Sequence, residues 1–175
     1  MKRLVLVLVG FAAGLIVIPA IIYFYLVFGN PPVATSDTPF PFESRIVKIP
    51  MAARIHRDMP ATTPLPMNDA NLIAGAAVYQ HNCAFCHGLR SAPTAISKTM
   101  FPRVPQLWSK HKNGVVGVSD DPVGETYWKV KNGIRLSGMP SYDSLLSEDQ
   151  MWQVSILLSQ ADKPLPADAL KLVSP

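Results

Sequence analysis

The first apolar stretch of the chain runs from Leu4 to Phe28 without a charged residue and directly follows Lys2 and Arg3. A helix of that length spans roughly 37 Å at about 1.5 Å per residue, and the hydrocarbon core of a bilayer is about 30 Å thick. Pro19 is expected to kink this helix, which membranes tolerate. The pattern therefore predicts that residues 1–29 form a single transmembrane anchor.

A cleaved signal peptide is the alternative for this stretch. Its apolar region is about 7–15 residues long and ends at a small-x-small site. The present stretch is longer, and Pro32-Val33-Ala34 is a poor cleavage site. We therefore expect an uncleaved signal-anchor and leave cleavage after export as the open alternative. Because basic flanks stay inside, Lys2 and Arg3 orient the N-terminus to the cytoplasm and the rest of the chain to the outer side.

Residues 30–67 form a proline-rich linker that is also rich in apolar side chains. The prolines forbid a long helix across it; they are Pro31, Pro32, Pro39, Pro41, Pro50, Pro60, Pro64 and Pro66. The apolar residues are too many for a segment that only dangles in water; they include Phe40, Phe42, Ile46, Val47, Ile49, Met51, Ile55 and Met59. We therefore expect part of the linker to dock on the folded domain or on another subunit.

Helical periodicity begins after the linker. Asn68 or Asp69 can cap a helix in which Leu72, Ala76 and Tyr79 recur at helical spacing. Gly75 inside that helix needs a packing reason, and the close approach of a second helix supplies one.

The second helix is predicted near the C-terminus, where Ser147 to Gln150 form a capping box. A third is expected from Glu125 to Asn132, with Gly133 as its stop. No stretch shows sustained strand alternation, and Gly88 to Gly124 reads as loops with short helical turns. The fold class is therefore all-α, with a domain over residues 68–162 and residues 163–175 as a C-terminal tail.

Composition and charge narrow the partners. At 175 residues the chain has room for one domain plus an appendage. Residues 1–67 hold six basic and three acidic residues, and residues 68–175 hold ten basic and nine acidic residues. The domain is therefore nearly neutral, and we do not expect it to bind nucleic acid. The linker's basic residues could face anionic headgroups or an acidic partner, or be simply solvated; they are Arg45, Lys48, Arg54 and Arg57.

The candidate chemistry lies in Cys83-Ala84-Phe85-Cys86-His87. Two thiols three positions apart, with a histidine directly after the second, make the attachment signature of a c-type haem. Each thiol can add to one vinyl group of the porphyrin, and the imidazole can serve as proximal iron ligand. The motif predicts one haem c, bound covalently by Cys83 and Cys86, with His87 as an axial ligand.

Other interpretations of this motif fit less well. A structural zinc site needs four ligands, and the chain has no further cysteine and no zinc-type spacing among His56, His81 and His111. A thioredoxin-like motif would accompany a βαβ pattern, which is absent from the sequence. A disulfide across two residues would be strained and would need no histidine.

Together these patterns resemble the class I c-type cytochromes, here in a monohaem, membrane-anchored form, over roughly residues 68–162. In that family the N-terminal helix carries a glycine and an aromatic before the cysteine pair, and Gly75 and Tyr79 match those places. The family's C-terminal helix crosses there and supplies an aromatic, for which Trp152 is the candidate.

The resemblance also implies further haem contacts. The sixth iron ligand is a methionine in a loop before the last helix, and Met139 in Gly138-Met139-Pro140 matches it. Met100, or a bis-His site with His111 or His81, is the alternative. A proline carbonyl that holds the proximal histidine is expected from Pro105, in a Pro-x-Leu segment with Leu107. Further candidates for the haem pocket are Arg103, Trp108, Tyr127 and Trp128.

A haem with both axial positions filled exchanges single electrons and takes no substrate. The resemblance thus implies an electron carrier of a respiratory-type chain, not an enzyme, acting alone or as a subunit of a larger redox complex. Expected partners are a quinol-oxidising complex or dehydrogenase and a terminal oxidase or reductase. The expected location is a bacterial inner membrane, with a single pass and the haem domain on the periplasmic side. A haem enzyme or a gas or redox sensor, with an open or labile sixth position, is the alternative.

Overall fold

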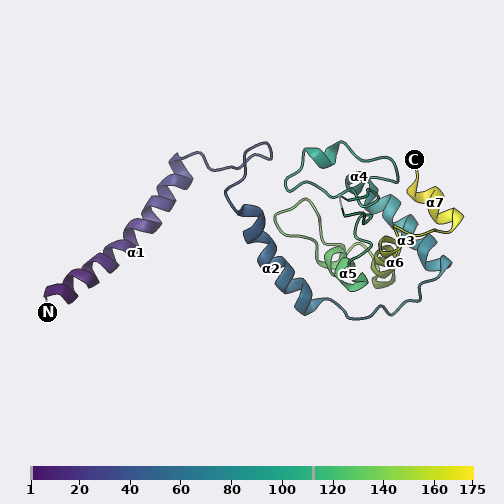
Figure 1. Ribbon diagram of the computed structural model, residues 1–175, viewed down its shortest axis with the longest axis horizontal. Coiled ribbons are helices and arrows are strands. Elements are labelled where there is room, and N and C mark those ends of the chain that lie inside the picture. The colour runs from purple at the N-terminus through teal and green to yellow at the C-terminus, as the bar shows by residue number, and fades with distance from the viewer. Residues whose placement is uncertain (1, 112) are drawn as a thin grey trace. The chain divides into compact units, whose positions relative to one another are not determined.

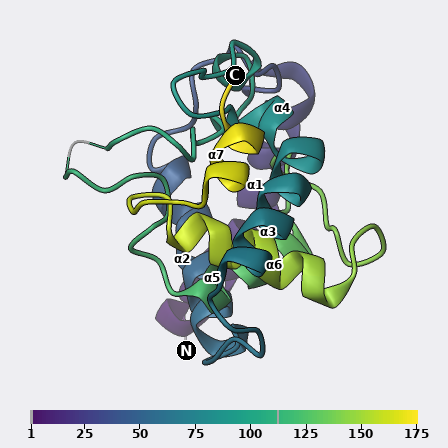
Figure 2. The same cartoon turned by 90° about the vertical axis from the view of Figure 1, so that its right-hand side faces the viewer.

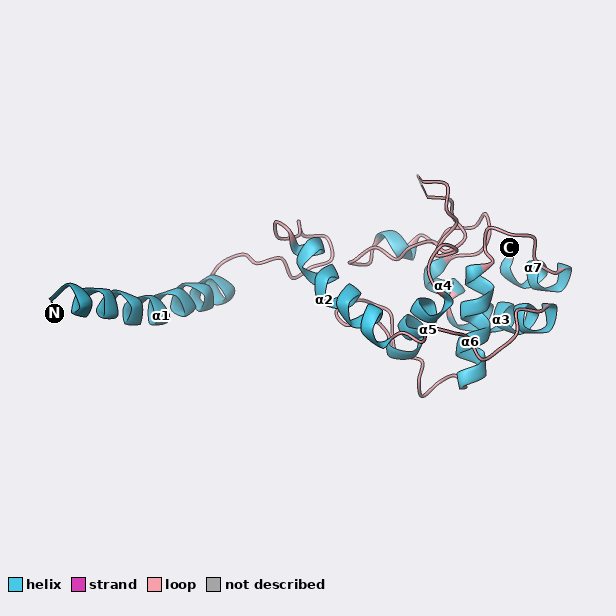
Figure 3. Cartoon of the chain, turned by 60° about the horizontal axis from the view of Figure 1, so that its bottom comes forward, coloured by secondary structure: helices cyan, strands magenta, loops and turns pink. Residues whose placement is uncertain are grey.

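The computed structural model of the protein describes residues 2–111 and 113–175, and its chain divides into two compact units between Phe40 and Pro41. The regular elements of the described residues are helices, and extended pairing is limited there to two isolated bridges, Leu89 with Ala92 and Lys110 with Val116 (Figures 1 and 3). The predicted all-α class is therefore confirmed.

The first unit is dominated by α1 (Lys2–Phe28), which passes Pro19 without a break. At about 1.5 Å per residue its 27 residues extend about 40 Å, enough to cross a bilayer. Within the described residues it is the one helix that is long and apolar enough to do so, and none of its side chains is buried in the protein. Met1, the first residue of the expected anchor, lies outside the described residues.

The core of the second unit forms where α3 (Asp69–Asn82) meets α6 (Glu148–Ser159). Asn68 caps α3 by accepting from the Asn71 backbone N–H, and Ser147 and Gln150 form the capping box of α6. The helices touch at Gly75, where an added Cβ would clash with the backbone carbonyl of Gln153. The close approach expected at this glycine is thus present.

Shorter elements complete the second unit. α4 (Ala84–His87) directly follows α3, and η1 (Ile96–Lys98) lies in the long loop after it. α5 (Val123–Asn132) packs against α6 and stops at Gly133, whose φ of 66° only glycine adopts readily.

The C-terminal tail prediction needs correction, because its residues form α7 (Ala167–Val173), which packs along α3 (Figure 2). Ala169 and Val173 are fully buried, and the Arg90 backbone N–H donates to the Val173 carbonyl at 2.8 Å. The helix has seven residues, so its apolar repeat is too short to stand out in the sequence. Packing against α3, and not local propensity, therefore stabilises it.

The linker prediction was also wrong in one respect: α2 (Glu43–Asp58) is a helix of 16 residues. Pro41 and Pro60 lie outside its ends, and only Pro50 lies inside, where it removes one backbone donor. The helix packs against α5 through Ile55, which is only 4% exposed. Burying that side chain contributes about 1.5–3 kcal/mol, which offsets much of the cost of Pro50. The expected docking on the folded domain is thus present for this part of the linker.

Candidate haem site

The Cys83–His87 turn continues the last turn of α3. Backbone N–H groups of Cys86 and His87 both donate to the Cys83 carbonyl, at 3.2 and 2.9 Å. Both thiols are free and half-buried. Burial raises the pKa of the Cys83 thiol to about 12, so this thiol is neutral at physiological pH. The turn therefore offers two uncrosslinked thiols from one segment.

The imidazole of His87 is held from one side. Its Nδ1 lies 2.8 Å from the carbonyl oxygen of Pro105, which can only accept, so Nδ1 donates. Burial lowers the pKa of His87, and the bond to Pro105 opposes this shift without cancelling it. The side chain is thus a neutral imidazole with the lone pair on Nε2, the form that coordinates a metal.

The loop that carries Pro105 is hydrogen-bonded to the Cys83–His87 turn, which we call the attachment turn. The Gln106 side chain accepts from the Thr94 backbone N–H at 2.8 Å and donates to the Cys86 carbonyl at 3.1 Å. Thr94 Oγ1 donates to the same carbonyl at 2.8 Å, and the Leu107 backbone N–H donates to the His87 carbonyl at 3.3 Å. The sequence alone assigned no role to Gln106 or Thr94, because their side chains bond to backbone groups, and such bonds leave no recognisable pattern of residue types.

Behind the turn, Tyr79 and Trp108 meet edge to face with ring centres 5.5 Å apart. The Tyr79 hydroxyl donates to the Gly88 carbonyl at 2.6 Å, which fixes the chain just after His87. The indole N–H of Trp108 is buried and has no hydrogen-bond partner in the described part of the chain. A buried donor without a partner is costly, so an acceptor on a bound cofactor would stabilise Trp108; the indole N–H of Trp152 in α6 is unpaired in the same way.

The loop of Met139 is tightly closed. Its ends are joined by the Ile134 backbone N–H, which donates to the Met139 carbonyl at 3.2 Å. The Tyr142 hydroxyl donates to the Asn82 carbonyl at 2.8 Å, one residue before Cys83. The half-buried Met139 itself packs against the core. Tyr142 was not singled out in the sequence analysis as a residue that fixes this loop. Its position three residues after Met139 could have indicated that role.

A second thioether lies beside this loop. The methyl group of Met100 occupies the space that a Cβ on Gly138 would need, so Met100 touches the residue that precedes Met139. Met100 was the alternative sixth ligand in the sequence analysis. Because it lies next to the Met139 loop, it remains an alternative that mutation can test.

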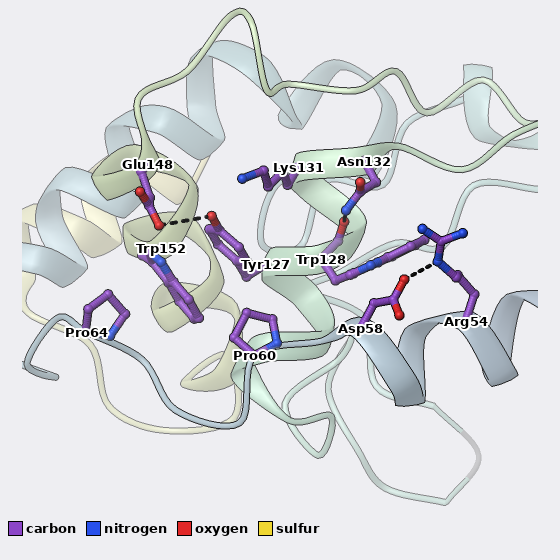
Figure 4. A pocket seen from close by; sticks show the side chains of 10 residues that line it. All are labelled: Arg54, Asp58, Pro60, Pro64, Tyr127, Trp128, Lys131, Asn132, Glu148 and Trp152. Atoms are coloured by element: carbon purple, nitrogen blue, oxygen red, sulfur yellow. Dashed lines mark hydrogen bonds and ion pairs between the residues drawn. The ribbon is translucent and has the colours of Figure 1, made fainter.

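Other residues that the sequence analysis singled out lie away from the hydrogen bonds of the attachment turn. Tyr127, Trp128 and Trp152 line an open hollow of about 540 Å³ between α2 and the α5–α6 pair (Figure 4). The Tyr127 and Trp152 rings stack with centres 3.9 Å apart, and Arg103 is exposed in the long loop. Among the described residues, no hydrogen bond or ring contact joins Tyr127 or Trp128 to the attachment turn, so their place in a haem pocket stays a prediction.

The residues present fit a covalently attached haem. Two free thiols, an oriented imidazole and a buried indole donor converge from α3, α4 and the following loop. The helix pair, the attachment turn and the methionine loop together define a c-type cytochrome domain of class I. The model of the family described as "Cytochrome C oxidase, cbb3-type, subunit III" matches residues 70–156, which supports a monohaem c-type cytochrome domain of class I in this part of the chain. No curated protein matches the chain.

A c-type cytochrome domain implies covalently bound haem c as the cofactor and supports electron transfer as the class of activity. When bound, the haem supplies an iron that alternates between ferric and ferrous states. Cys83 and Cys86 would attach the haem, and the Pro105 carbonyl would orient the His87 imidazole as proximal ligand.

Proposed function

We propose that the protein is a membrane-anchored monohaem cytochrome that carries single electrons in a respiratory chain, with His87 and Met139 as the axial iron ligands. The observation that carries the proposal is the closed Met139 loop, which Tyr142 joins to the end of α3 at Asn82. A ligand on a loop fixed in this way stays bound in both oxidation states. Little reorganisation is then needed for each electron, which suits a carrier.

The partners follow from the anchor and from the family. The matched family carries the name of a subunit of a cbb3-type oxidase, which supports acceptance of electrons from a quinol-oxidising complex or dehydrogenase and delivery to a terminal oxidase or reductase. Lys2 and Arg3 before α1 support a cytoplasmic N-terminus, and hence a periplasmic haem domain at a bacterial inner membrane. The chain acts there as a free carrier or as a fixed subunit, and not as an enzyme.

Axial ligation can be tested on the purified full-length holoprotein. We expect its ferric form to show the weak far-red band of methionine-ligated haem, and Met139→Ala to lose that band and bind CO rapidly when reduced. Met67→Leu, at an exposed position before α3, is the matched control and retains the band.

Two outcomes would overturn the assignment. Loss of the band in Met100→Leu, with retention in Met139→Ala, would assign the ligand to Met100. Rapid CO binding by the unaltered ferrous protein would favour an enzyme or a gas sensor. Covalent haem that persists in denaturing electrophoresis of every variant shows that attachment at Cys83 and Cys86 is intact, so ligation alone is being compared.

A further inference from the structure

Helix α2 has apolar side chains on two sides. Met51 and Ile55, one turn apart, face the domain, where Ile55 is buried and Met51 half-buried. Ile46, Ile49 and Ala53 recur at spacings of three and four residues and form a second stripe. Ile46 is 63% exposed and Ile49 is 70% exposed, so nothing in the second unit covers this stripe. The helix thus has an outward apolar face besides the one that docks.

The charges around the outward stripe are mainly positive. α2 carries four lysine or arginine residues, one histidine and two acidic residues, and the exposed Arg45 and Arg57 flank the stripe. Arg54 and Arg57 both pair with Asp58, whereas Arg45 and Lys48 form no ion pair among the described residues. An apolar stripe with a cationic rim is the pattern of helices that lie in the interface of an anionic bilayer.

The chain itself brings α2 to a membrane. Residues 29–42 connect the end of α1 to the start of α2, and a fully extended segment of this length reaches at most about 50 Å. The exposed Phe42 begins the stripe at the end of this tether. A lipid surface is therefore within reach of the stripe whenever α1 is inserted in a membrane.

We propose that the outward stripe of α2, formed by Ile46, Ile49 and Ala53 with Phe42 at its start, lies in the anionic lipid headgroup layer of the membrane that α1 spans. The proposal rests on the membrane anchoring in the proposed function and is independent of the axial ligation. Because Ile55 joins α2 to α5, this contact holds the haem domain at the membrane surface.

Site-directed spin labelling of the full-length holoprotein in phosphatidylglycerol nanodiscs tests the proposal. Haem attachment consumes both native thiols, so Ala53→Cys provides a single labelling site on the stripe, and Lys171→Cys on the far helix α7 provides a reference site. We expect the ratio of oxygen to nickel-chelate accessibility to be several-fold higher at residue 53 than at residue 171, and to fall when phosphatidylcholine replaces phosphatidylglycerol.

Matched variants complete the design. Added to the residue 53 label, Ile49→Ser should return the ratio to the value of the reference site, whereas Val47→Ser, at an exposed position on another side of α2, should leave it unchanged. Equal ratios at residues 53 and 171, or equal effects of the two serine variants, would overturn the proposal. A label at residue 53 that becomes immobile and shielded from both reagents only in native membranes would assign the stripe to a protein partner instead.

The same preparations separate the two proposals. If the protein does not co-migrate with nanodiscs, the anchoring in the proposed function has failed. If it co-migrates but residue 53 stays in water, only the α2 proposal has failed.

Discussion

The Tyr79 side chain links the core of the domain to the haem attachment turn. Its ring packs against Trp108, and its hydroxyl donates to Gly88 directly after His87. Burial raises the pKa of Tyr79 above its ordinary value, so the hydroxyl remains a donor over the whole physiological range. One residue thereby joins α3, the turn and the long loop.

Tyr79 also makes stability depend on pH. As pH rises above about 10, the unfolded chain loses the Tyr79 proton while the folded chain keeps it, so the free energy of unfolding falls. Below pH 10 this contribution is fully present. Tyr79→Phe should cost about 1 kcal/mol at pH 7 through the lost hydrogen bond, and should make the decline above pH 10 shallower.

Urea unfolding followed by far-ultraviolet circular dichroism from pH 7 to 11, in detergent, measures both effects. Tyr127 and Tyr142 also have raised pKa values, so the decline is reduced and not abolished. Parallel pH curves for the variant and the unaltered protein would contradict the role of Tyr79.

Gly75 is the residue on which the helix crossing depends. Gly75→Ala places a methyl group against the Gln153 carbonyl, which cannot move without shifting α6. We expect a loss of about 1–3 kcal/mol in the free energy of unfolding. Gly138→Ala is the matched control, because its Cβ meets only the flexible end of Met100, and it should cost under about 1 kcal/mol. Equal losses in urea titrations would disprove the crossing as the cause.

At the scale of elements, α7 and α2 are helices that lack clear local signals in the sequence and that packing against the domain stabilises. Each covers part of the domain through a small set of buried side chains, Ala169 and Val173 in α7 and Ile55 in α2. Both are bordered by prolines, which limit their lengths. Their stability therefore lies in the contacts with α3 and α5.

The contribution of α7 can be measured at its buried end. Val173→Ala should lower the free energy of unfolding by about 2 kcal/mol, because it leaves a cavity against α3. Lys171→Ala, on the exposed side of the same helix, should stay within about 0.5 kcal/mol. Similar small losses for both would mean that α7 does not stabilise the domain.

The elements that could be predicted are those with local signals. α3 has its Asn68 cap, α5 its Gly133 stop and α6 its capping box, and all three form as expected. The bond from His87 to the Pro105 carbonyl was expected from the family resemblance, and it is present in the geometry. The clamp by Gln106 and Thr94 could not be foreseen, because it depends on how a long loop folds back on α4.

At the scale of the whole molecule, the candidate membrane helix α1 and the cytochrome domain belong to separate compact units. Among the described residues, the buried core residues all lie in the second unit, and the first unit has one long apolar helix. We therefore expect haem binding and membrane attachment to be separable.

Replacing residues 1–29 with a cleavable signal peptide tests this separation. We expect a soluble periplasmic protein that retains covalent haem and the optical spectrum of the full chain, while the full chain resists extraction by alkaline carbonate. Recovery of the full chain in the carbonate extract would contradict retention of the anchor, and loss of haem from the soluble form would contradict the independence of the second unit.

The clamp formed by Gln106 and Thr94 has a consequence for how the chain can vary. It closes the loop at its base, so the span from Ala95 to Arg103 lies outside the bonds that orient His87. Doubling the length of such a closed loop costs only about 0.6 kcal/mol in closure entropy. We expect insertions in this span that spare Met100 and Arg103 to leave the bonds that orient His87 in place, so the span could accept a grafted recognition segment.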